Sequence, residues 1–189
     1  MNPMVAVIAP GMMGGAVGGR LVENGLKVLT SLIGRSAETA ARAKQYGLTA
    51  ASDEEIARAD FILSILPPGD AVALAERFAP ALTASNSKPV FVECNALSPH
   101  TAERVAAVIA PTGSPFVDAG IIGAPPKTGD KGPRFYASGP AAPRFAALKQ
   151  YGLDVRLLDG PLTAASAMKM SYAGTVSYTH LTLPTKRIV

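Results

Sequence analysis

Residues 5–18, VAVIAPGMMGGAVG, join a short apolar run to a cluster of glycines. The run Val5–Ala9 contains β-branched residues and is short, which is typical of a buried strand. Apolar residues at helical spacing continue as far as Val22, and the pair Asn24-Gly25 has the composition of a helix end. The sequence therefore predicts a strand, a tight glycine-rich turn and a helix in immediate succession.

The glycine-rich turn has the spacing of a phosphate-binding loop. The fingerprint is G-x-G-x-x-G between a strand and a helix, and here Ala9 takes the place of the first glycine. The middle glycine allows the backbone to approach a pyrophosphate, and the free N–H groups of the helix start attract an anion. We expect the cofactor to contact this turn through Ala9, Gly11, Met12, Met13 and Gly14. A tight turn without a ligand is the alternative.

The end of the second expected strand, residues 27–33, indicates which dinucleotide binds. An NAD site places an acidic residue there, about 20 residues after the glycines, for the ribose hydroxyls. This chain has Gly34-Arg35-Ser36 and no acid between Val28 and Ala37. The guanidinium of Arg35 suits a 2′-phosphate, and Ser36 offers a hydroxyl or its backbone N–H. The sequence predicts NADP rather than NAD; the alternative is that Arg35 is a solvated surface residue.

Expected strands alternate with expected helices through at least the first 110 residues. This pattern predicts an α/β fold with a doubly wound, mostly parallel sheet and helices on both faces. Further strands are expected at 61–66, 89–94, 116–122, 134–138 and 155–158. Helices are expected at 36–46, from 52, at 70–79, 98–110 and 140–151, and from about 162.

Composition excludes several classes of protein. The 189 residues are 48% hydrophobic and 17% charged, as in ordinary globular proteins. With Cys94 as the single cysteine and two histidines, a disulfide, a thiolate zinc cage and a multi-histidine site are excluded, so we expect no metal. The net charge of +4 is spread along the chain, which argues against a nucleic-acid partner. No apolar run reaches the length of about 18–20 residues that spans a membrane, and the start is a poor signal peptide. We expect a cytoplasmic chain without a membrane partner.

The order of motifs resembles the β-hydroxyacid dehydrogenase family, the relatives of 6-phosphogluconate dehydrogenase and imine reductases. The resemblance covers nearly all of residues 4–174. The similar segments are Ile8–Gly14 (I-G-L-G-x-M-G in the family), Gly34-Arg35-Ser36 (N-R-T or N-R-S in NADP users), Ser64–Pro67 (over the adenosine side of the cofactor), Glu93–Pro99 (D-x-S-T-x-x-P, near the nicotinamide ribose) and Phe116–Ala124 (F-V-D-A-P-V-S-G-G, on the substrate side).

This resemblance implies a Rossmann-type fold and an NADP-dependent oxidoreductase. Such an enzyme transfers hydride to or from a small hydroxy acid, keto or imine substrate, and the full-length protein is a homodimer. Lys169 falls at the place of the catalytic lysine, which exchanges the substrate proton; a solvated helix lysine is the alternative. The resemblance adds three cofactor-binding residues, Leu66, Pro67 and Asn95. It also places four residues on the substrate side, namely Ile122, Gly123, Ala124 and Tyr172. A non-catalytic NADP-binding module is the alternative function.

The chain departs from the family pattern in ways that indicate a divergent branch. Besides Ala9, Asn95-Ala96 replaces a Ser-Thr pair, and Ile122 replaces a serine that contacts the substrate carboxylate. Tyr172 stands where the family carries an asparagine.

The composition changes after about residue 174. Alanine disappears from residues 175–189, which resemble the translation of a transposase-type sequencing adapter; a genuine polar tail with two short strands is the alternative. We therefore expect an NADP-binding domain over 1–161, the start of an interdomain helix over 162–174 and a non-native tail over 175–189. On this interpretation the chain is a fragment that lacks the family's C-terminal helical domain and is inactive alone.

Overall fold

The computed structural model describes residues 2–127 and 129–181, with side chains through residue 175. An eight-stranded sheet with the order β3-β2-β1-β4-β5-β6-β7-β8 forms its centre. Neighbouring strands are parallel, except that β7 runs antiparallel to β6. The strands are β1 (Val5–Ile8), β2 (Val28–Thr30), β3 (Thr49–Ala50), β4 (Phe61–Ser64), β5 (Val90–Glu93), β6 (Phe116–Ile122), β7 (Arg134–Ser138) and β8 (Asp154–Leu157).

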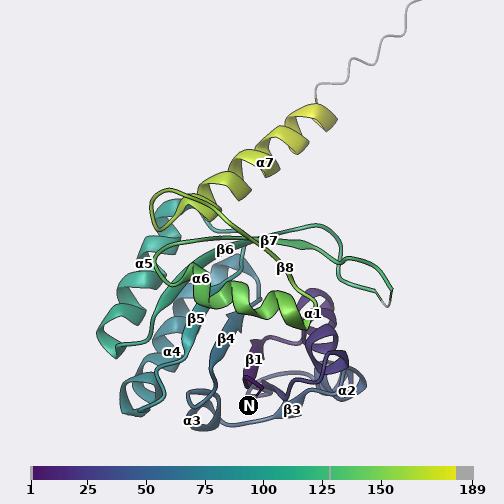
Figure 1. The fold of residues 1–189 in the computed structure, drawn as a ribbon, viewed down its shortest axis with the longest axis vertical. Coiled ribbons are helices and arrows are strands. Elements are labelled where there is room, and N and C mark those ends of the chain that lie inside the picture. The colour runs from purple at the N-terminus through teal and green to yellow at the C-terminus, as the bar shows by residue number, and fades with distance from the viewer. Residues whose placement is uncertain (1, 128, 182–189) are drawn as a thin grey trace, which may run out of the picture.

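Helices cover both faces of this sheet (Figure 1). They are α1 (Met12–Glu23), α2 (Ala37–Gln45), α3 (Asp53–Ile56), α4 (Ala71–Ala84), α5 (Pro99–Ile109), α6 (Ala142–Phe145) and α7 (Ala164–Leu181). Along β1, Val5 and Val7 join the core beneath α1, α2 and α6, whereas Ala6 and Ile8 join the core beneath α3, α4 and α5. A strand that is buried on both faces needs a continuous apolar run, which explains the composition of β1. The predicted doubly wound α/β fold is confirmed.

Four glycines let α1 lie unusually close to its neighbours. A Cβ atom on Gly15 or Gly19 would approach the ring of Tyr46 to 2.8 or 2.6 Å. On Gly18 it would lie 3.0 Å from the side chain of Leu48, and on Gly14 it would overlap the carbonyl oxygen of Ala9. The glycine cluster is therefore partly a packing requirement of the helix.

Some element boundaries differ from the sequence-based expectations. The short edge strand β3 was not expected, and the helix expected at 140–151 consists of α6 and a 3-10 segment, Ala146–Tyr151. Helix α4 continues to Ala84 through Pro80, which lies on the exposed side where the freed carbonyl of Glu76 can bond to water.

The end of the chain also differs from expectation. Helix α7 does not end near residue 174 but extends to Leu181, projecting away from the sheet (Figure 1). Residues 175–181, the first part of the expected tail, are thus helical, whereas the alternative of a genuine tail had two short strands. The rest of that tail, 182–189, lies outside the described residues. Within the described part of the chain, no helix combines the length and apolarity needed to cross a membrane.

Candidate functional site

A cavity of about 290 Å³ lies where β1 and β4 end. The chain order of the strands reverses at this point of the sheet, because β2 and β3 extend from β1 on one side and β5 follows β4 on the other. Ligands of open α/β sheets bind at such a switch point. Eight of the ten predicted cofactor residues line the cavity: Ala9, Gly11, Met12, Met13, Gly14, Arg35, Leu66 and Pro67. Ile65 and Thr39 complete the lining.

Gly11 and Gly14 are glycines for different reasons. Gly11 has an ordinary φ of −71°, and a Cβ atom built on it would meet nothing within 4 Å. Neither backbone conformation nor packing within the chain requires a glycine there. At Gly14, by contrast, the added Cβ would overlap the carbonyl oxygen of Ala9. The open space above Gly11 therefore fits a group that approaches the backbone from the cavity.

The start of α1 is suited to hold an anion. Gly11 is the N-cap and supplies no side-chain hydrogen bond, and the first turn carries no acidic residue. The first N–H groups of a helix lack intrahelical partners and carry the positive end of its dipole. Among the residues that line the cavity, Arg35 alone is charged. The cavity is thus positive in character and fits a phosphorylated ligand.

Ser36 contributes to the site differently from the prediction. Its hydroxyl accepts a hydrogen bond from the backbone N of Thr39, at 3.2 Å, and caps α2. It also pairs with the Thr39 hydroxyl at 3.1 Å, and it is Thr39 that lines the cavity. Sequence reasoning missed Thr39, although the cap spacing of three residues places it in the first turn of α2, beside Arg35.

Asn95 supports the cavity from behind instead of lining it. Its amide oxygen accepts a hydrogen bond from the backbone N of Leu66, at 2.7 Å, and its amide nitrogen donates to Ser64 Oγ, at 3.0 Å. The same nitrogen donates to Glu93 Oε1, which also accepts from the backbone N of Asn95 at 2.9 Å. Asn95 is buried, so the amide is engaged within the protein. We find no contact of its side chain with the cavity among the described residues.

Glu93 is a fully buried carboxyl that sequence reasoning did not single out. Burial raises its pKa to about 7, against the opposing effect of the hydrogen bonds from Asn95. Its second oxygen, Oε2, has no hydrogen-bond partner among the described residues. A buried acidic side chain at the end of an apolar strand was the available signal, because such groups are rarely buried without a role.

Lys169 lies on α7, beside the last residues of β6. Its amine donates to the carbonyl of Ile121, and Gly120 permits the close approach, since a Cβ there would lie 3.1 Å from Lys169 Cβ. Burial lowers the pKa of Lys169. The structure thus brings Lys169 to the strand end that holds the predicted substrate-side Ile122. Lys169 lines none of the described cavities, and neither does Tyr172, whose side chain is 51% exposed.

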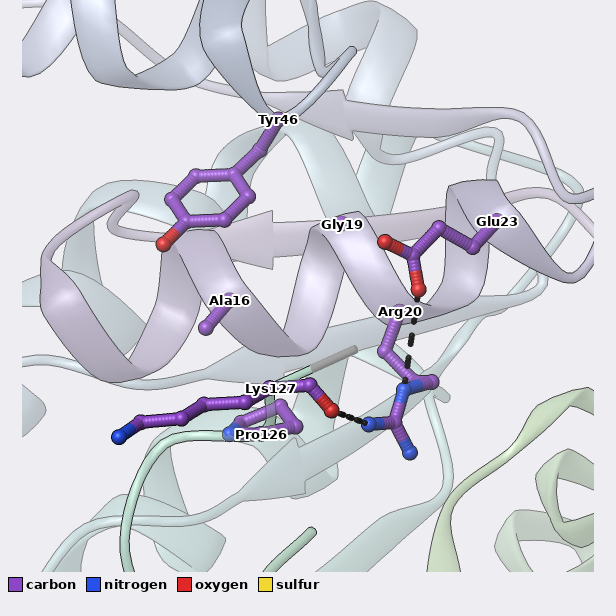
Figure 2. A pocket seen from close by; sticks show the side chains of 7 residues that line it. All are labelled: Ala16, Gly19, Arg20, Glu23, Tyr46, Pro126 and Lys127. Atoms are coloured by element: carbon purple, nitrogen blue, oxygen red, sulfur yellow. Dashed lines mark hydrogen bonds and ion pairs between the residues drawn. The ribbon is translucent and has the colours of Figure 1, made fainter. Parts of the chain in front are cut away.

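Two further hollows lie along α1, under the loop between β6 and β7. The first has a volume of about 280 Å³ and is lined by Ala16, Gly19, Arg20, Glu23, Tyr46, Pro126 and Lys127 (Figure 2). In it, Arg20 donates to the Lys127 carbonyl at 2.8 Å and to Asp130 Oδ1 at 3.0 Å, which fastens the loop to α1. The second hollow, of about 440 Å³, contains Ala124 and Met12. The predicted substrate-side residue Ala124 lines this second hollow, which shares Met12 with the 290 Å³ cavity.

Gly123, another predicted substrate-side residue, has a structural reason to be glycine. Its φ is +130°, which L side chains rarely adopt, and a Cβ there would lie 3.0 Å from Pro133 Cα. This backbone conformation sends the chain from β6 into the loop that Arg20 holds.

The fold and the cavity together define a dinucleotide-binding domain. The family described as the NAD binding domain of 6-phosphogluconate dehydrogenase matches residues 4–150, and the chain belongs to this family. The predicted resemblance is thereby confirmed. No curated protein matches the chain.

Solved structures resemble the chain over most of its length. A conserved protein of unknown function, described as structurally similar to 3-hydroxyacid dehydrogenases, is 31% identical with a TM-score of 0.80 over 93% of this chain and 65% of its own. The 3-hydroxyisobutyrate dehydrogenase from Mycobacterium tuberculosis is 20% identical, with a TM-score of 0.80 over 96% of this chain and 62% of its own. An imine reductase from Myxococcus stipitatus in complex with NADP⁺ is 18% identical, with a TM-score of 0.76 over 95% of this chain and 63% of its own. A variant of the Myxococcus enzyme is in complex with NAD⁺. The chain thus spans less than two thirds of the length of these structures.

Proposed function

We propose that the cavity at Gly11 binds NADP and that the chain is the cofactor-binding domain of an NADP-dependent oxidoreductase. The observation that carries this proposal is the open space at Gly11, the one glycine of the turn that the protein itself does not require. A pyrophosphate fits there because it can approach the backbone and the uncapped start of α1.

The preference for NADP over NAD rests on the charges around the cavity. Arg35 lines it, and none of the ten lining residues carries a carboxylate that would accept the ribose hydroxyls of NAD. A planar guanidinium binds phosphate strongly. Thr39, in the first turn of α2 and four residues after Arg35, adds a hydroxyl to the lining.

The substrate belongs to the classes on which this family acts: a small hydroxy acid, a keto compound or an imine. The bound nicotinamide supplies or accepts the hydride. The protein must then take up or return one proton at the reacting oxygen or nitrogen, and Lys169 is the candidate group. Its lowered pKa favours this role, because a lysine exchanges protons near neutral pH only when its cationic form is disfavoured.

A non-catalytic NADP-binding module is the second candidate, and the position of Lys169 favours it. The amine is bonded to the Ile121 carbonyl and lies outside the cavity lining. Turnover distinguishes the two candidates: an enzyme oxidises NADPH in the presence of an imine, keto acid or aldehyde, and the module binds NADPH without oxidising it.

Calorimetric titration with NADPH tests the binding site. The chain should bind NADPH, and Gly11→Val should abolish binding because its side chain fills the space above the turn. Circular dichroism of the variant should stay close to that of the unchanged chain, because that space is open. Binding that survives in Gly11→Val would place the cofactor elsewhere.

A further inference from the structure

Four buried polar side chains form a row across adjacent strands. Ser64 in β4 is in register with Glu93 in β5, Glu93 with Asp118 in β6, and Asp118 with Ser138 in β7. All four have no exposed surface. Buried polar groups are costly unless they are hydrogen-bonded, so the partners of this row indicate what it stabilises.

The two halves of the row face different parts of the chain. Ser138 and Asp118 accept hydrogen bonds from the backbone of Ala165 and Ser166, at the start of α7. Ser64 and Glu93 accept hydrogen bonds from Asn95 instead. Ser64 and Glu93 therefore contact the residue that binds Leu66, which lines the cavity.

We propose that Glu93 is a positioning residue for the cofactor cavity, acting through Asn95 on the backbone of Leu66. This inference rests on the proposed function, because it assigns a role in holding the same cofactor. Neither the glycine pattern of the turn nor Arg35 predicts this role for Glu93.

The geometry gives each link of this chain of contacts. Glu93 Oε1 accepts from both the backbone N and the side-chain nitrogen of Asn95. This fixes which end of the Asn95 amide faces Glu93, since Oε1 already accepts a hydrogen bond from the backbone N and an accepting oxygen repels the amide oxygen. The amide oxygen is thereby turned toward the backbone N of Leu66, 2.7 Å away. Leu66 and the residue after it, Pro67, form one wall of the cavity.

A second contact ties the same wall to the phosphate turn. The backbone N of Ala9 donates to the carbonyl of Ile65 at 3.0 Å. The segment 65–67 is therefore held on one side by Asn95 and on the other by the turn that precedes Gly11. Without the acceptor at Glu93 the Asn95 amide can rotate, and its oxygen no longer holds Leu66 at the cavity rim.

NADPH affinity, measured by fluorescence titration of the whole chain, tests the proposal with three variants. Glu93→Gln keeps a carbonyl oxygen at the accepting position and should bind within about twofold of the unchanged chain. Glu93→Leu removes the acceptor and should weaken binding by about tenfold, as should Asn95→Ala. Ser114→Ala is the control, because Ser114 Oγ is also buried with no hydrogen-bond partner among the described residues but precedes β6, away from the row.

The double variant Glu93→Leu/Asn95→Ala separates positioning from a general structural effect. If Glu93 acts through Asn95, the double variant binds NADPH no more weakly than Asn95→Ala alone. Losses that add, or a folded Glu93→Leu with unchanged affinity, would overturn the proposal. If Glu93→Leu does not fold, Asn95→Ala decides, and unchanged affinity in that variant overturns it. Failure of the unchanged chain to bind NADPH would instead contradict the proposed function.

Discussion

The carboxylate of Asp118 in β6 accepts two hydrogen bonds from Ser166 in α7, one from the backbone N at 2.7 Å and one from the hydroxyl at 2.6 Å. Ser166 belongs to the first turn of α7, whose N–H groups have no intrahelical partner. A buried carboxylate from a neighbouring strand thus caps this helix and meets the positive end of its dipole. Lys169 follows three residues later on the same helix.

Removing the Asp118 carboxylate should destabilise the fold. In Asp118→Ala two buried donors of Ser166 lose their partner, and we expect the free energy of unfolding to fall by about 2–4 kcal/mol in urea titration. Asp154→Ala on β8 is the matched control, because Asp154 pairs with Arg156 and Arg134 at the surface and should contribute much less. Equal losses in the two variants would show that Asp118 does not anchor α7.

The two glycines of the phosphate turn should differ in how much stability an alanine costs. Gly14→Ala places a Cβ against the Ala9 carbonyl and should cost about 2–4 kcal/mol of unfolding free energy without cofactor. Gly11→Ala places it in open space and should cost less than about 1 kcal/mol. Thermal unfolding of both variants measures the difference. A larger loss in Gly11→Ala would contradict our inference that packing requires Gly14 but not Gly11.

Glu93 should make stability depend on pH. Its pKa is raised from 4.5 to about 7 in the folded chain, so between these values the folded state holds a proton that the unfolded state has released. The contribution of Glu93 to the free energy of unfolding should therefore be largest below pH 4.5, and it should fall by about 3 kcal/mol as the pH rises to 7. Asp118 also has a raised pKa, so the difference between the unchanged chain and Glu93→Gln isolates Glu93. Parallel pH profiles for the two proteins would contradict the prediction.

The chain alone should bind NADPH without oxidising it. Lys169, the candidate proton-exchanging group, donates to the Ile121 carbonyl and does not line the cavity. Absorbance of NADPH during incubation with imines, keto acids and aldehydes checks this. Oxidation that disappears in Lys169→Ala would prove the prediction wrong and would favour the enzyme over the non-catalytic module.

The sequence predicted the parts of the site that follow local patterns. Glycine spacing after an apolar strand predicted Gly11 and Gly14, the residues that follow β2 predicted Arg35, and the family resemblance added Leu66 and Pro67; all five line the cavity. The sequence could predict that these residues lie together because the carboxyl ends of parallel strands meet at one edge of the sheet.

Contacts between distant segments were not predictable in this way. Asn95 reaches Leu66 across 29 positions, and Asp118 reaches Ser166 across 48. A pattern within one strand shows that Glu93 is buried but not which amide it orients. The role of Asn95 therefore became visible only when its hydrogen-bond partners were known.

The binding of NADPH and NADH to the unchanged chain and to Arg35→Asp tests the central claim most directly. Calorimetry should show tighter binding of NADPH than of NADH by the unchanged chain, and Arg35→Asp should remove that preference by losing affinity for NADPH. Arg104→Asp, which makes the same change of charge at an exposed position of α5, should retain the preference. Equal affinities for the two cofactors in the unchanged chain, or unchanged NADPH affinity in Arg35→Asp, would contradict the assignment of the cavity as an NADP site.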